Sequence, residues 1–210
     1  RWGMPDRTIL TGPYGLDPAE MRKLIGYDLP MEQRIARAKK LMADAGYEKG
    51  FKARLLGRVL GEFQRMGAWL GDQYRKHLNI ELEIVAREIN EARKMRDNLD
   101  FELYMDNPLV LTGDPDEYAS YFMTTGAANF TKVGSAEQDI LWAAQSQATD
   151  FAKRQEMCRE IERLIIKDAY VWNISNNVYT AGWQNYVKGY FQHALIYSNR
   201  HRMDTVWLDR

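Results

Sequence analysis

Apolar residues in the first half of the chain recur with two different periods. Segments in which they return every third or fourth position, as in an amphipathic helix, are separated by segments in which apolar and polar residues alternate. The alternating pattern is clear in "IELEIV", where Ile80, Leu82 and Ile84 share one face. The predicted helices are 31–45, 60–77 and 88–98, and the predicted strands are 51–57, 80–85 and 101–105. Strands and helices that alternate at this spacing predict an α/β fold, with right-handed crossovers and a mainly parallel sheet flanked by helices.

The second half of the chain is mainly helical. Ser135 and Gln138 form a capping box, in which the hydroxyl and the side-chain amide each satisfy a free backbone N–H at a helix start. This helix is predicted to run to about Ala148. Thr149 and Asp150 then separate it from a second helix, whose apolar residues are Met157, Ile161, Leu164 and Ile165.

The end of the chain has a weaker pattern. Residues 170–183 indicate two short β segments joined by a turn at Asn176 and Asn177. From Tyr186 onward there is little periodicity until 204–208. Because no repeat, low-complexity stretch or flexible linker interrupts the chain, we expect one compact α/β unit with a loosely attached end.

Composition excludes several functional classes. Lys and Arg together number 29, as do Asp and Glu, so no net field draws the chain onto nucleic acid, and we expect no nucleic-acid partner. No apolar run approaches the roughly 20 residues that a membrane helix needs. The single cysteine, Cys158, lies in a helical pattern and is expected to be a buried core thiol. It leaves the cellular compartment open.

Enzyme motifs are missing from the sequence. There is no phosphate loop, no GxGxxG nucleotide fingerprint and no GxSxG elbow. His77, His193 and His201 have no second His or Cys at the spacing of a metal site. We therefore expect a protein without a cofactor or a bound metal.

One stretch nevertheless concentrates chemically capable side chains. "GDPDEYASYF", residues 113–122, contains the carboxylates Asp114, Asp116 and Glu117 around a proline. It lacks the oxygen spacing of an EF-hand calcium loop. Three interpretations stay open: a turn in which Asp closes on the backbone ahead of a helix, a ligand-binding wall, or a catalytic acid pair.

Neighbouring residues favour binding over catalysis. The stretch follows the strand 101–105, and ligands of open α/β sheets bind at the carboxyl ends of the strands. Arg58 follows the strand 51–57, so we expect it at the same sheet edge as Asp114. We expect Asp114→Ala and Tyr118→Ala to weaken binding in the full-length protein while leaving folding nearly intact. The candidate ligand-binding residues are Asp114, Asp116, Tyr118, Tyr121, Asn129, Phe130 and Arg58.

Several segments together resemble a known family. "GYDLPMEQRIARAKKLMADAGYEKGF" is followed in order by "FELYM", Asp114-Pro115, Asn129, "SAEQDILWAA" and "TDFAKRQEMCREIERLIIKDA". This series resembles the second lobe of the dipeptide, oligopeptide and nickel type (family 5) of solute-binding proteins of ABC importers. The resemblance extends from about Pro13 to Gly189.

The resemblance implies a fold and a function. The fold would be a lobe of a type II periplasmic-binding-protein clamshell, with 1–185 as the second lobe and 186–210 as a tail that returns toward an absent first lobe. The chain starts at "RWGMPDRT" without an initiator Met, and we expect it to be part of a longer protein. Such a protein is not an enzyme. It captures a small solute, peptide-like or other, and delivers it to ABC permease subunits, in the periplasm or outside the cell, associated with the membrane through those partners.

One departure from the family leaves the solute open. Oligopeptide-binding members commonly carry a Trp shortly before an Asp after the third strand, whereas "DNPLVLTGDPD" has none. Two alternatives from other classes remain: a glycan-acting hydrolase that uses Asp114 with Asp116 or Glu117, and a protein-interaction domain without a small ligand.

Overall fold

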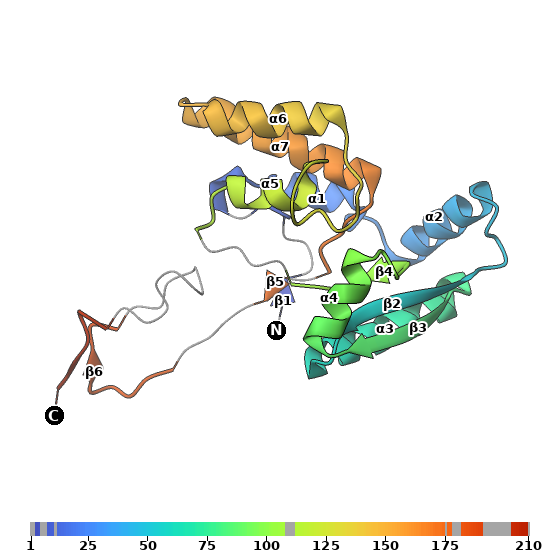
Figure 1. The fold of residues 1–210 in the computed structure, drawn as a ribbon, viewed down its shortest axis with the longest axis horizontal. Helices are drawn as coiled ribbons and strands as arrows, with labels where there is room; N and C mark the ends of the chain where they lie inside the picture. Colours follow the sequence, from blue (N-terminus) through green and yellow to red (C-terminus); the bar gives the residue numbers. More distant parts are fainter. Residues whose placement is uncertain are drawn as a thin grey trace. The chain divides into compact units, whose positions relative to one another are not determined.

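The structure, a computed structural model, divides the chain into two compact units. It describes residues 3–4, 8–10, 12–107, 112–174, 176–177, 182–190 and 203–209. One unit is Gly26–Pro108, and the other combines Arg1–Ile25 with Leu109–Arg210 (Figure 1). The expectation of a single compact unit is therefore wrong. Each unit buries an apolar cluster of its own, and no Gly- or Ser-rich linker marks the boundary in the sequence.

The unit Gly26–Pro108 is built on a three-stranded sheet. Its strands are β2 (Lys52–Arg58), β3 (Glu81–Arg87) and β4 (Leu103–Tyr104). Their order is β3-β2-β4, and both pairings are parallel, as the alternation of periods predicted. Leu55 is opposite Ile84 and Leu103, and Leu56 is opposite Val85 and Tyr104. The predicted α/β fold with a parallel sheet is confirmed.

Helices cover both faces of this sheet, so Leu55 and Leu56 are both buried although they point to opposite faces. On one face, α3 (Gly61–Leu78) brings Gly67 against Leu55 and Ile84. On the other, α4 (Ile89–Asp97) packs Ala92 against Leu56 and Val85. The helix α2 (Met31–Asp44) contacts α3 (Figure 1). These helices match the predicted segments closely.

The other unit is mainly helical. Its helices are η1 (Gly12–Tyr14), α1 (Pro18–Leu24), α5 (Asp116–Phe122), α6 (Ala136–Gln147) and α7 (Phe151–Asp168). α6 and α7 pack side by side (Figure 1). Between them and α5 lies a core in which Phe122 stacks on Trp142 with ring centroids 6.4 Å apart. Cys158 belongs to this core and is fully buried, as expected.

Two antiparallel pairs of very short strands complete the described chain. β1 (Gly3–Met4) pairs with β5 (Asn176–Asn177), and β6 (Val187–Lys188) pairs with β7 (Trp207–Leu208). The predicted turn at Asn176 and Asn177 is therefore wrong. Two asparagines favour a turn locally, but here a segment from the other end of the sequence supplies the backbone partners. Residues 178–181, which were to carry the second β segment, lie outside the described residues.

The capping box at the start of α6 is half confirmed. The Ser135 hydroxyl accepts a hydrogen bond from the Gln138 backbone N–H at 3.1 Å, and the helix ends at Ala148 as predicted. The Gln138 side chain, however, donates to Asp168 Oδ2 at 3.1 Å and accepts from the Tyr170 hydroxyl at 2.8 Å. It is fully buried, so partners from α7 and the segment after it replace the local backbone N–H.

Candidate functional site

The stretch with three carboxylates forms a tight turn that leads into α5. Asp114 Oδ1 accepts a hydrogen bond from the Asp116 N–H at 3.0 Å, and the Asp114 N–H donates to Thr112 Oγ1 at 3.2 Å. The Glu117 carboxylate accepts from the Thr112 N–H at 3.0 Å. These contacts are those of an Asx turn ahead of a helix. We call residues 112–117 the acidic turn.

Arg154 of α7 forms an ion pair with Asp114 of the acidic turn. Its Nη2 lies 2.7 Å from Asp114 Oδ1 and its Nη1 lies 3.1 Å from Asp114 Oδ2, a bidentate pair. Asp116 Oδ1 is 3.8 Å from the same guanidinium. The Tyr14 ring lies 5.2 Å from the guanidinium carbon. Only 17% of the Arg154 side chain is exposed, so the pair is partly shielded from water.

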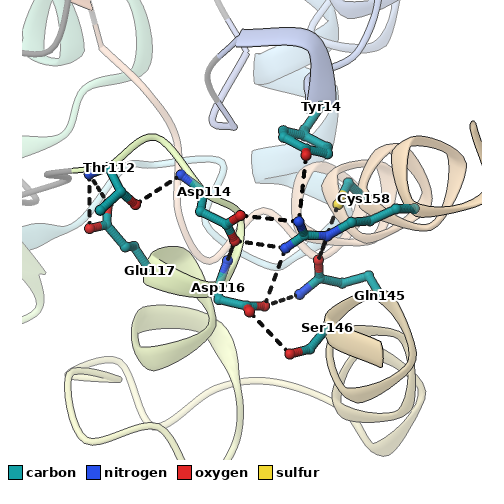
Figure 2. A network of polar contacts seen from close by, with 9 residues as sticks. Tyr14, Thr112, Asp114, Asp116, Glu117, Gln145, Ser146 and Cys158 are labelled. Atoms are coloured by element: carbon teal, nitrogen blue, oxygen red, sulfur yellow. Dashed lines mark hydrogen bonds and ion pairs between the residues drawn. The ribbon is translucent and has the colours of Figure 1, made fainter. Parts of the chain in front are cut away.

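Gln145 and Ser146 of α6 complete the network shown in Figure 2. The Gln145 carbonyl oxygen accepts from Arg154 Nε at 3.0 Å, and its amide nitrogen donates to Asp116 Oδ1. The Ser146 hydroxyl donates to Asp116 Oδ2 at 3.0 Å. Gln145 is fully buried. The Asp114 and Asp116 carboxylates are thus held by side chains of α6 and α7.

The ion pair between Arg154 and Asp114 shifts the pKa values of the two groups in opposite directions. The Arg154 guanidinium beside Asp114 lowers the pKa of that carboxyl, and Asp114 in turn raises the pKa of Arg154. Burial raises the pKa of the Cys158 thiol to about 11. A glycosidase's general acid needs a raised pKa so that it stays protonated near neutrality. The direction at Asp114 opposes that role.

Two of the candidate binding residues are buried in the fold. Tyr118 is 5% exposed and packs in the core of α5, α6 and α7. Asn129 is fully buried, and its amide nitrogen donates to the Met123 and Val133 carbonyl oxygens, both at 2.9 Å. Its carbonyl oxygen accepts from Thr131 and Lys132. The burial of Tyr118 argues against the expectation that it can be replaced with folding nearly intact, and Asn129 likewise supports the packing of its loop.

The remaining aromatic candidates contact each other. Tyr121 and Phe130 are half-buried, and their rings meet edge to face with centroids 6.5 Å apart. Tyr121 is in α5, and Phe130 is in the loop that joins α5 to α6. Their role in binding a solute stays a prediction.

Arg58 lies at the carboxyl end of β2 in the other unit. Its Nη2 is 3.1 Å from Asp106 Oδ1, and its guanidinium carbon is 5.0 Å from the centre of the Phe63 ring. Asp106 also accepts from the Tyr104 hydroxyl at 2.8 Å, and burial raises the pKa of Tyr104 to about 12. Arg58 Nε is buried and has no hydrogen-bond partner within the described residues. The small hollow beside it, lined by Phe63, Ile84 and Met105 among others, has room for about one water molecule.

The structure brings some of the candidate binding residues together, and one of them belongs to the other unit. Asp114 and Asp116 share one network, whereas Arg58 belongs to the other unit. That Arg58 and Asp114 share one sheet edge stays a prediction. Sequence reasoning missed Arg154 and Gln145 as partners of the acidic turn. Arg154 had a signal, because it ends the Asp-x-x-x-Arg pattern that begins at Asp150, but nothing in the sequence distinguished Gln145.

Neither a metal site nor a membrane-spanning helix is found in the described part of the chain. There, no group of three His, Cys, Asp or Glu side chains is placed to hold a metal ion. Within the same ranges, no helix combines the length and the apolar character needed to cross a membrane.

This chain matches known proteins in structure, although no match is found by sequence. No family model matches the sequence, and no curated protein sequence matches it. Solved structures do match over nearly the whole chain. An ABC transporter substrate-binding protein, CtaP of Listeria monocytogenes, is 20% identical with a TM-score of 0.77, covering 100% of this chain and 42% of its own. The Escherichia coli murein tripeptide-binding protein MppA is 18% identical with a TM-score of 0.77, covering 97% of this chain and 38% of its own. Burkholderia pseudomallei OppA is 18% identical with a TM-score of 0.73, covering 99% and 40%.

This chain shares their fold. The resemblance read from the sequence is therefore confirmed at the level of fold. The chain spans about two fifths of the length of these solute-binding proteins.

Proposed function

We propose that this chain is the second lobe, with a C-terminal tail, of a solute-binding protein that captures a small solute and delivers it to an ABC-type permease. The observation that carries the proposal is the fold match over 97–100% of the chain to proteins described as binding proteins rather than enzymes. In this proposal the protein is non-catalytic. It works in the periplasm or outside the cell and associates with the membrane through its permease.

Peptides are the solute class that the neighbours support best. MppA is described as a murein tripeptide-binding protein, a dipeptide-binding protein of Pseudoalteromonas was solved with Met-Leu, and DppA of Helicobacter pylori was solved with the peptide STSA. The acidic turn carries three carboxylates, of which Asp114 and Asp116 lie beside one guanidinium, so the turn keeps net negative charge that favours a cationic group such as a peptide's ammonium. Arg58 supplies a donor for an anionic group.

Solute capture would occur by closure of two lobes around the solute. The solute binds more tightly to the closed state, and this difference in affinity drives closure. Half of the contacts would then come from the first lobe. A charge-assisted bond from the acidic turn would be worth about 1.5–3 kcal/mol with water excluded, but only about 0–1 kcal/mol left open to solvent.

Calorimetry with a defined panel of peptides tests the proposal. The panel contains dialanine, trialanine and a mixed oligopeptide library, titrated into this chain alone and into the chain joined to a first lobe. We expect weak binding by the chain alone and tight binding by the joined protein, without turnover. Hydrolysis of any solute, or equal affinity in the two proteins, would overturn the proposal.

A further inference from the structure

We infer that Arg154 is a positioning residue, which holds the acidic turn in place through Asp114 and thereby sets the geometry of the surface that the turn presents. The inference rests on the proposed function in one respect, namely that the turn faces the solute. The local geometry stands without it. Its consequence is that Asp114 supports the turn rather than contacting the solute directly.

The first support is how fully Arg154 is engaged. Its guanidinium contacts both oxygens of Asp114, the Gln145 carbonyl oxygen through Nε, and the Tyr14 hydroxyl at 3.5 Å through Nη1. These partners come from η1, from the turn and from α6, three segments that are far apart in the sequence. A lysine in this place keeps the charge but cannot reproduce a planar fork that meets Asp114 and Gln145 together.

The second support is that Asp114 has little capacity left for a solute. Both of its oxygens already accept from Arg154, and Oδ1 also accepts from the Asp116 N–H. Binding a solute's ammonium group directly would compete with a bidentate ion pair whose guanidinium is mostly shielded from water. The pair instead links α7 to the first turn of α5, so the position of α7 determines where that turn lies.

Amide hydrogen exchange on the chain without solute tests this role. The reporter is the Asp116 N–H, which donates to Asp114, and the reference is the Gln138 N–H, which donates to Ser135. In Arg154→Lys and in Asp114→Asn we expect the Asp116 amide to exchange at least about tenfold faster, because the turn opens locally, while the Gln138 amide keeps its rate. The double variant should be no faster than either single one, since both changes remove the same interaction.

Arg163→Lys is the matched control. Arg163 is on the same helix and forms ion pairs with Glu20, Glu156 and Glu160, but these partners lie outside the acidic turn. It should leave the Asp116 amide unchanged. A merely structural role for Arg154 would speed both reporters together through global unfolding. That result, or an unchanged Asp116 amide in Arg154→Lys, would overturn the inference. Because no solute is present, failure of the peptide titrations would leave this result intact.

Discussion

Fully buried polar side chains show at the residue scale how contacts hold this protein together. Among the described residues they are Asn129, Gln138, Gln145 and Glu162. Each has hydrogen-bond partners in distant segments or in loop backbone, as burial of a polar group requires. The sequence marks none of them as core, because Asn, Gln and Glu are mostly exposed in proteins.

Asn129 was predicted to bind a solute, and its surroundings give a sharper expectation for stability. We expect Asn129→Ala to lower the free energy of unfolding by about 2–4 kcal/mol, because two carbonyl oxygens and two donors lose their partner inside the protein. Chemical denaturation measures the change. Asn90→Ala, at an exposed site on α4, is the matched control and should change stability by no more than about 0.5 kcal/mol. Equal effects of the two substitutions would contradict this account.

Asp114 should make stability depend on pH in a defined direction. Because Arg154 lowers its pKa from the ordinary value of 3.8, the folded state favours the charged carboxylate. The stabilisation is therefore present above pH 3.8 and is lost as the pH falls through the lower, folded-state pKa. Thermal unfolding of the chain and of Asp114→Asn, followed from pH 7 downward, should show a difference in Tm that shrinks below about pH 4. A difference that grows on acidification would refute the assignment.

At the scale of elements, α7 holds the segment before α1 through its charged face. The Glu162 carboxylate accepts from the Leu16 N–H at 2.8 Å, from the Leu10 N–H at 3.4 Å and from the Ile9 N–H. Arg159 donates to the Gly15 carbonyl oxygen at 3.3 Å. Hydrogen bonds to backbone groups thus help to fix the path of this segment, alongside the burial of Leu10 and Leu16.

Glu162 gives the opposite pH dependence to Asp114. Burial raises its pKa above the ordinary value of 4.5, and the three backbone N–H groups only partly offset this effect. Its contribution to stability is greatest below pH 4.5 and declines as the pH rises through the raised pKa. The free energy of unfolding of the chain relative to Glu162→Gln should therefore fall between acidic and neutral pH. Glu160→Gln, which removes a carboxylate paired with Arg163 on the same helix, serves as the control and should not show this decline.

At the scale of the whole molecule, the two units have separate cores. Leu56, Val85 and Ala92 form one, and Trp142, Ile161 and Ile165 belong to the other. Cores that share no residues allow the units to open separately, since local stability follows the contacts that each region makes.

This separation predicts where core substitutions act. Leu56→Ala and Ile161→Ala each remove a fully buried side chain and should cost about 2–5 kcal/mol in their own unit. Hydrogen exchange should show Leu56→Ala speeding the amides of β2 and β3 while those of α6 and α7 keep their rates, and Ile161→Ala doing the reverse. A uniform change across the chain would mean that the two units unfold together.

Local patterning predicted most helices and the parallel sheet. The apolar period of 31–45 and 60–77 places α2 and α3 to within a residue or two, and the alternation in 80–85 places β3. α3 buries Phe63, Gly67 and Leu70 on one face, so period and burial agree there, whereas α2 has no buried residue. Asn176 and Asn177 failed because pairing with β1 overrode a local turn preference.

By itself, the sequence determined the longer helices and the parallel sheet, because these follow from periodicity and spacing along neighbouring residues. Only the tertiary structure decided which side chains meet. Three contacts join segments that are far apart in the chain. They are the bidentate pair of Arg154 with Asp114, the hydrogen bond from Gln145 to Asp116 and the hydrogen bond from the Leu16 N–H to Glu162. The division into two units was also decided there, because it depends on which apolar residues share a core and has no linker to mark it. Such contacts depend on how helices pack in three dimensions, and no local pattern encodes them.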